Sequence, residues 1–151
     1  MPEERARELF AAARVARLAT AGAGGAPRLV PVTFAVLRDG EKGTVVTAVD
    51  HKPKAGTDLR RLRDIHDNPR VCLLADHYED DWERLWWVRA DGHARVVEGG
   101  AERERAVTCL VRKYAQYRER PPAGPAILVL VERWSGWSYA PEPGPPPGER
   151  Q

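Results

Sequence analysis

The chain of 151 residues carries a formal net charge of +2, with 42% hydrophobic and 30% charged residues. This length and composition are typical of one globular domain that buries a sizeable core. The charge is too small to indicate nucleic acid or a membrane surface as a partner, and no apolar run reaches membrane-spanning length.

The N-terminal segment and the cysteines predict a cytoplasmic protein. Residues 2–5 open a charged segment, which is unlike a signal peptide. Cys72 and Cys109 are the only cysteines, and neither has a second cysteine at a metal-binding spacing. We therefore expect two free thiols in a reducing compartment.

Residues 2–13 predict a helix, because a proline lies near its start and Glu3 and Glu4 lie in its first turn. Leu9 and Phe10 belong to its apolar stripe.

A β-hairpin is predicted next, from two short apolar runs at residues 15–20 and 27–34 that flank a glycine-rich turn. Alternation in the first run places Ala16, Leu18 and Thr20 on one face. Pro31 has no N–H to donate, so the second strand is expected at a sheet edge or a bulge, where a barrel leaves room for a ligand.

The rest of the chain predicts more strands than helices, and the two do not alternate one for one. This pattern argues against a parallel, doubly wound sheet and favours a small antiparallel barrel with helices at its ends. We expect one domain at residues 1–140 and a disordered Pro/Gly-rich tail at 141–151. The expected strands are 44–49, 70–75, 85–98 with a bend at Gly92, and 126–139, the last either a strand pair or a single bent strand. The expected helices are 59–67 and 101–118.

Three motifs follow one another along the chain. They are R-L-A-T at residues 17–20, P-x-x-x-P-V-x-F at residues 27–34, and N-P-x-V at residues 68–71 after a short helix. In this order they resemble the pyridoxamine 5'-phosphate oxidase-like, flavin-binding split barrels, over about residues 5–140. The resemblance implies a split β-barrel, that is, an antiparallel Greek-key barrel with flanking helices. Residues 76–92 are similar to an actinobacterial branch thought to use the deazaflavin coenzyme F-420.

Basic residues gather in and after the loop that follows the strand at 44–49. Lys52, Lys54 and Arg61 offer charge-assisted donors of the kind that phosphate groups bind. The resemblance implies that such residues hold the cofactor phosphate, and Arg61 falls where relatives often carry lysine. The alternative is a solvated helix face, which we favour for the neighbouring Arg60.

The resemblance also implies that two strand ends line the isoalloxazine or deazaflavin ring, mainly through their backbone. The residues concerned are Pro31, Val32, Thr33, Thr47 and Ala48. For the valines of these strands the alternative is a plain core position.

Trp86 and Trp87 are neighbours on one predicted strand, so their side chains point to opposite faces. One ring packs on the core, and the other needs a cover from a partner subunit or from a flat cofactor ring. The resemblance implies a homodimer that holds its cofactor at the subunit interface. The alternative is cover from the same subunit, such as the helix at 101–118.

No catalytic side chains and no metal site are predicted. The histidines lack zinc-site spacing, and neither G-x-S-x-G nor a Walker motif occurs. The acidic loop at 76–83 is better explained as a solvated loop or as a partner for the basic helix than as a metal site. The resemblance implies an oxidoreductase in which F-420 carries hydride to or from a small-molecule substrate. FMN is the alternative cofactor, and a non-enzymatic module that binds flavin, haem or deazaflavin is the alternative class.

Overall fold

The computed structural model describes residues 1–50 and 57–141. Their strands form one seven-stranded sheet in the order β2-β1-β5-β6-β7-β4-β3, and its strand pairs are antiparallel. The predicted fold class, a mainly antiparallel sheet with flanking helices, is confirmed. The strands are β1 Ala16–Thr20, β2 Arg28–Val32, β3 Ala35–Leu37, β4 Thr44–Ala48, β5 Arg70–His77, β6 Trp86–Val97 and β7 Ala126–Ser138. The helices are α1 Glu3–Ala12, α2 Thr57–Asp67, the 3-10 turn η1 Trp82–Arg84, α3 Gly100–Lys113 and α4 Ala115–Glu119.

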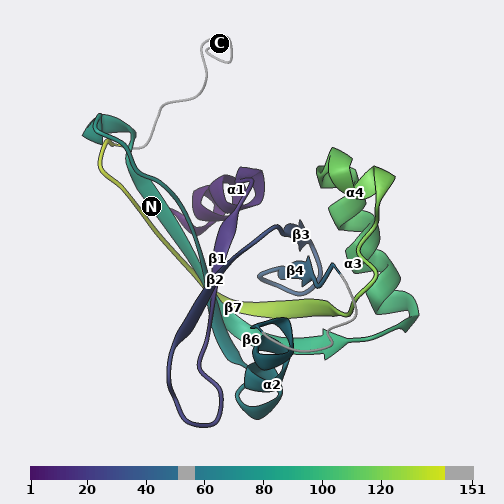
Figure 1. The fold of residues 1–151 in the computed structure, drawn as a ribbon. Helices are drawn as coiled ribbons and strands as arrows, with labels where there is room; N and C mark the ends of the chain where they lie inside the picture. Colours follow the sequence, from purple (N-terminus) through teal and green to yellow (C-terminus); the bar gives the residue numbers. More distant parts are fainter. Residues whose placement is uncertain (51–56, 142–151) are drawn as a thin grey trace.

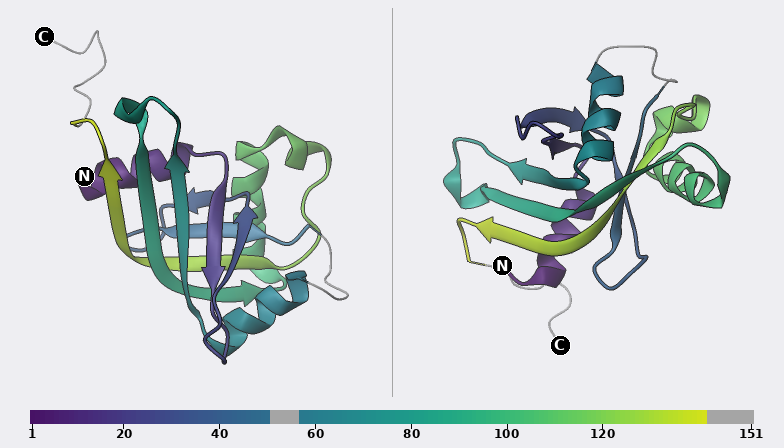
Figure 2. Two further views of the ribbon diagram at one scale, coloured as in Figure 1. Left: turned by 60° about the vertical axis from the view of Figure 1, so that its left-hand side comes forward. Right: turned by 90° about the horizontal axis from the view of Figure 1, so that it is seen from below.

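The sheet curls around the long strands β6 and β7, which pair along their whole length (Figures 1 and 2). The register shifts between Asp91 and Gly92, where we expected a bend. A Cβ atom at Gly92 would lie 2.2 Å from the carbonyl oxygen of Leu130, so the close approach of the two backbones requires glycine. One end of this strand pair projects with η1, and the other end runs beside α3 (Figure 1).

The predicted hairpin is confirmed as the antiparallel pair β1–β2, with Ala16, Leu18 and Thr20 buried. Pro31 lies on β2, an edge strand, as its missing N–H required. The predicted second strand at 27–34 is too long, because β2 ends at Val32 and the short strand β3 begins at Ala35. Since β2 and β3 are opposite edges of the sheet, this two-residue link brings the edges together, as a curled half-barrel requires.

Two apolar clusters hold these layers together. The larger lies inside the curl, where Phe10 of α1 packs on Phe34 and Trp134 at ring distances of 4.7 and 5.2 Å. The smaller lies between α3 and the other side of β4 and β7, and it contains Leu110 and Leu128. The α1 and α3 helices therefore cover opposite sides of the β7 region.

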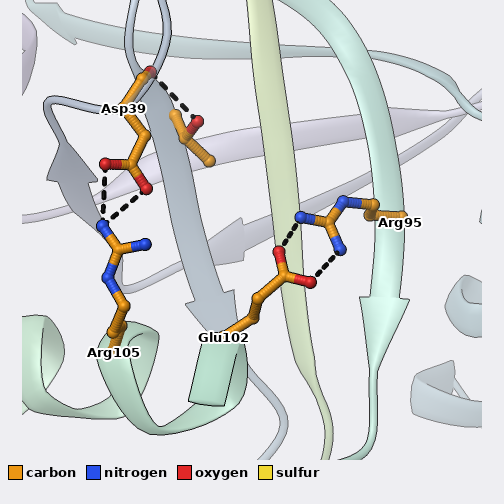
Figure 3. A network of polar contacts seen from close by, with 5 residues as sticks. Asp39, Arg95, Glu102 and Arg105 are labelled. Atoms are coloured by element: carbon orange, nitrogen blue, oxygen red, sulfur yellow. Dashed lines mark hydrogen bonds and ion pairs between the residues drawn. The ribbon is translucent and has the colours of Figure 1, made fainter. Parts of the chain in front are cut away.

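Two ion pairs attach α3 to its surroundings (Figure 3). Arg95 of β6 forms a two-fold contact with Glu102, and Arg105 donates to both carboxylate oxygens of Asp39 at 2.7 and 2.6 Å. The hydrogen bonds from Arg95 lower the pKa of Glu102. These contacts fix the start of α3 against β6 and against the turn after β3.

The predicted single helix at 101–118 is wrong at Tyr114, where the chain is extended, with φ −115° and ψ 118°. The helix ends at Lys113 and resumes as α4 at Ala115. The Tyr114 hydroxyl donates to the Arg14 carbonyl at 2.8 Å and accepts from the Phe34 amide at 3.1 Å. These contacts join residues 100 and 80 positions apart, so they carry no local sequence signal.

Candidate functional site

A pocket of about 430 Å³ lies where the ends of β2 and β4 meet α2 and the α3–α4 junction. Three segments that are distant in sequence supply the residues expected to bind a cofactor. Those that line the pocket are Pro31, Val32, Thr33, Thr47, Ala48 and Arg61. The structure therefore brings the predicted ring-binding strand ends together with one of the predicted phosphate-binding cations.

The other predicted residues lie elsewhere. Lys52 and Lys54 fall outside the described residues. Trp86 faces inward, packs against the main core and lines a different pocket beside Arg5 and Leu9. Trp87 lies on the outward face of β6, opposite Trp137 of β7. Neither Trp86 nor Trp87 lines the pocket between β2 and β4.

Residues that the sequence did not identify complete the pocket. They are Val30, Val49, Asp50, Tyr114, Gln116 and Tyr117. The break at Tyr114 is what directs two tyrosines, three positions apart, toward the sheet. Their rings meet edge to face at 5.7 Å. A usable sequence signal was this pair of polar aromatics at the end of an amphipathic helix.

A hydrogen-bonded chain of side chains runs along one side of the pocket. The hydroxyls of Thr33 and Tyr117 lie 2.7 Å apart, and the Tyr117 hydroxyl donates to Asp50 Oδ1 at 3.3 Å. The Thr47 hydroxyl donates to the Thr33 carbonyl at 2.8 Å. We refer to Thr33, Tyr117 and Asp50 as the Tyr117 wall.

Burial raises the pKa of Tyr117, and the charge of Asp50 adds to this effect, while the hydrogen bond with Thr33 opposes it. Burial likewise raises the pKa of Tyr114. Both phenols therefore stay protonated at neutral pH and act as neutral hydrogen-bonding groups.

The backbone behind Asp50 is tied to the loop that precedes β7. The amide of Ala123 donates to the Asp50 carbonyl at 3.0 Å, and the amide of Val49 donates to the Pro125 carbonyl at 2.9 Å. The Arg103 guanidinium donates to the carbonyls of Pro122 and Gly124 at 2.9 to 3.1 Å. This loop thus keeps Asp50 beside Tyr117.

A second polar cluster fixes α2, the helix that carries Arg61. The Asp64 carboxylate is buried, accepts from Arg28 at 2.6 Å on both oxygens, and accepts from the Thr20 hydroxyl at 3.2 Å. Gly22 of the hairpin turn lies against it. We refer to Asp64, Arg28, Thr20 and Gly22 as the Asp64 corner, and it holds α2 against the β1–β2 hairpin.

Lys113 lies behind the pocket, at the end of α3. Its ammonium group donates to the Ala13 carbonyl at 2.7 Å and lies 3.7 Å from the centre of the Phe34 ring. Burial, with the nearby charge of Arg14, lowers the pKa of Lys113 to about 8.

Other site chemistries find no support in the described part of the chain. Within residues 1–50 and 57–141, no group of three or more His, Cys, Asp or Glu side chains is arranged to hold a metal ion. The same residues contain no helix of the length and apolarity needed to cross a membrane. Cys72 and Cys109 are free, as expected, and burial raises the pKa of both thiols.

A comparison with models of known protein families gives a match. A sequence model described as pyridoxamine 5'-phosphate oxidase matches residues 2–138. Among curated proteins no sequence matches this chain.

Solved structures show the same fold at low sequence identity. A conserved hypothetical protein from Mycobacterium tuberculosis is 20% identical, with a TM-score of 0.70 over 91% of this chain and 85% of that chain. An FAD-binding protein from Mesorhizobium loti is 21% identical, with a TM-score of 0.63 over 90% and 92% of the two chains. An FAD-binding protein from Mycobacterium smegmatis is 21% identical, with a TM-score of 0.57 over 91% and 94%. The fold is therefore a split β-barrel.

Proposed function

Because the chain belongs to the pyridoxamine 5'-phosphate oxidase family, we propose that it is an oxidoreductase that binds a flavin-type cofactor in the pocket between β2, β4, α2 and α4. One observation carries the proposal: residues from three distant segments, expected to bind such a cofactor, line this one pocket. The FAD-binding proteins of the same fold support a flavin-type ligand.

The residues of the pocket fit such a group. Arg61 supplies a guanidinium for a phosphate. The end of the edge strand β2 offers its backbone to a flat ring, and Thr33, directly after the strand, offers a small side chain. A bound flavin or deazaflavin supplies the hydride chemistry. The chain's part is then to bind and orient the cofactor, which agrees with the absence of any predicted catalytic side chain.

Between cofactors, we propose F-420, on the similarity of residues 76–92 to the F-420 branch, with FMN as the alternative. The test is to purify the protein from a host that lacks F-420 and titrate it with each cofactor by absorbance and fluorescence. We expect a nearly colourless protein that binds F-420 with micromolar or tighter affinity, about −8 kcal/mol, and FMN more weakly. A yellow preparation with stoichiometric FMN would establish the alternative, and binding of neither would reject the proposal.

Arg61→Ala tests the phosphate contact. Loss of one charge-assisted contact should weaken FMN binding roughly ten- to hundredfold and leave the affinity for riboflavin, which has no phosphate, unchanged. Arg60→Ala, an exposed neighbour on the same helix, is the matched control and should leave both affinities unchanged. Equal losses for FMN and riboflavin would place the phosphate elsewhere.

We further propose a homodimer formed through the outward face of β6 and β7, where Trp87 and Trp137 lie opposite each other. Trp87 is half-buried on this face beside Trp137, whose side chain is 38% exposed, and Leu29 of the neighbouring hairpin is 70% exposed. Apolar surface of this kind marks an interface. Trp87→Arg should yield a folded monomer by light scattering and circular dichroism, whereas Trp86→Arg, at a partly buried position packed against the core, should destabilise the fold. A wild-type monomer that binds cofactor would contradict this proposal.

A further inference from the structure

We infer that the Tyr117 wall selects ligand groups that donate hydrogen bonds, and that Tyr117 and Asp50 are therefore specificity-determining residues. The inference deepens the proposed cofactor site and rests on it. It follows from where the hydroxyl hydrogens of the pocket already point.

The described residues that line the pocket carry four hydroxyl groups, and each has a protein acceptor. Asp50, as a carboxylate, can only accept, so the Tyr117 hydrogen is committed to it at 3.3 Å. The Thr33 hydrogen must then serve the Tyr117 oxygen at 2.7 Å. Thr47 donates to the Thr33 carbonyl at 2.8 Å, and Tyr114 donates to the Arg14 carbonyl at 2.8 Å.

What the wall still offers a ligand is lone pairs. The oxygens of Thr33 and Tyr117 each retain acceptor capacity, and so does the Asp50 carboxylate. Burial raises the pKa of Tyr117, so the phenol does not ionise near neutral pH and the direction of the chain persists. Arg61 lines the same pocket. The pocket thus combines hydrogen-bond acceptors with a guanidinium among its lining residues.

The unused lone pairs of the wall determine which ligand groups it can bind. A ligand carbonyl or phosphate oxygen placed at the Tyr117 wall would face other oxygens, whereas an N–H or O–H group would be satisfied there. On a flavin-type molecule such donors have two sources: the imide N–H of the ring and the hydroxyls of the ribityl chain. We therefore expect one of these donors to lie against the wall.

The test compares ligands that differ in the hydrogen-bond donors they carry, all without phosphate. 3-Methylriboflavin lacks the imide N–H of riboflavin, and 3-methyllumiflavin lacks in addition the ribityl hydroxyls. In the wild type, removal of the donor that meets the wall should weaken binding about tenfold or more. If affinity falls on methylation of the imide nitrogen, the donor is the imide N–H. If it falls on removal of the ribityl chain, the donor is a ribityl hydroxyl.

Two variants then break the acceptor wall without removing the pocket. In Asp50→Asn the amide can donate to Tyr117, which frees the phenol hydrogen and makes the wall a donor; in Tyr117→Phe the phenol oxygen is absent. Both should reduce the tenfold penalty to about threefold or less. Arg60→Ala, distant from the wall on the exposed face of α2, should keep the full penalty.

The outcomes separate this inference from the proposed function. If flavins bind and the penalties are equal in the wild type and both variants, the wall does not select donors and only this inference fails. A penalty of full size in Tyr117→Phe marks a steric effect of the methyl group and also overturns it. If the wild type binds neither a flavin nor F-420, the proposed function itself fails.

Discussion

The Asp64 corner and the Tyr117 wall are both polar clusters that join distant segments of the chain. They differ in whether their hydrogen-bond acceptors are satisfied within the protein. Both oxygens of Asp64 contact Arg28, the Thr20 hydroxyl adds a third bond, and the residue is 7% exposed. The Tyr117 wall has Asp50 at its exposed rim and borders a pocket of about 430 Å³.

The difference separates two uses of the same chemistry. A cluster whose acceptors are satisfied within the protein contributes to stability and orients its neighbours, here α2 and Arg61. A cluster that keeps unused lone pairs beside a cavity is suited to recognise a ligand. Substitutions in the corner should therefore change the free energy of unfolding, and substitutions in the wall should change ligand preference.

Among substitutions in the corner and the wall, the largest stability loss is expected from Gly22→Ala in the Asp64 corner. Gly22 has φ +63°, and an added Cβ would lie 2.6 Å from Asp64 Oδ1. Backbone strain and displacement of the carboxylate together should cost about 2–4 kcal/mol of unfolding free energy, measured by urea denaturation.

Two glycines of the same turn separate strain from the clash. Gly25 has φ +75° and nothing within 4 Å of an added Cβ, so Gly25→Ala should cost about 1–2 kcal/mol from strain alone. Gly24 has neither a positive φ nor an atom within 4 Å of an added Cβ, so Gly24→Ala should change stability by less than about 1 kcal/mol. Equal losses at Gly22 and Gly25 would show that the corner has room to relax.

The two tyrosines of the α3–α4 junction should respond differently to loss of their hydroxyls. Tyr114→Phe removes the partner of the buried Phe34 amide, which should cost about 1–3 kcal/mol of stability. Tyr117→Phe leaves Asp50 free to contact water and should cost less than about 1 kcal/mol. Chemical denaturation of both variants gives the comparison, and a larger loss for Tyr117→Phe would mean that the wall is also a structural cluster.

The sequence predicted those elements whose signals are local. Alternation and the Gly/Pro turn were sufficient for the β1–β2 hairpin, and Asn68-Pro69 marked the end of α2 at Asp67. The two strand ends of the pocket and Arg61 followed from the family resemblance, because those motifs lie in continuous segments. Each of these features depends on residues within about twenty positions of one another.

What the sequence did not predict depends on contacts between distant residues. The break at Tyr114 follows from bonds to Arg14 and Phe34, and periodicity alone extends the helix through it. Asp50 and Tyr117 are 67 positions apart, and only the fold brings them together. The pairing of Arg28 with Asp64 has the same origin, since a charge on a hairpin and a charge on a helix carry no sign of their contact.

A further small effect is expected from Lys113, as a pH dependence of stability. Lys113 lies behind the pocket with Arg14, Cys109 and Tyr114 around it. Its pKa of about 8 in the folded protein is below the ordinary 10.5. Above pH 8 the unfolded chain therefore binds more protons than the folded one, so stability should rise with pH. The lysine is only partly buried, so after allowance for solvent screening the gain should be about 1 kcal/mol or less between pH 7.5 and 9.5.

The measurement is urea denaturation of the wild type and of Lys113→Met at pH 7.5 and at pH 9.5. The variant keeps an apolar side chain over Phe34 and has no charge to titrate, so the wild type should gain stability relative to it as pH rises. The pKa values of Cys109 and Tyr114 are raised, which limits their ionisation in this range. Arg14→Gln removes the neighbouring charge and should reduce the gain. A wild type that loses stability relative to Lys113→Met over this interval would mean that the ammonium group is stabilised where it lies, by the Ala13 carbonyl and the Phe34 ring, more than burial disfavours it.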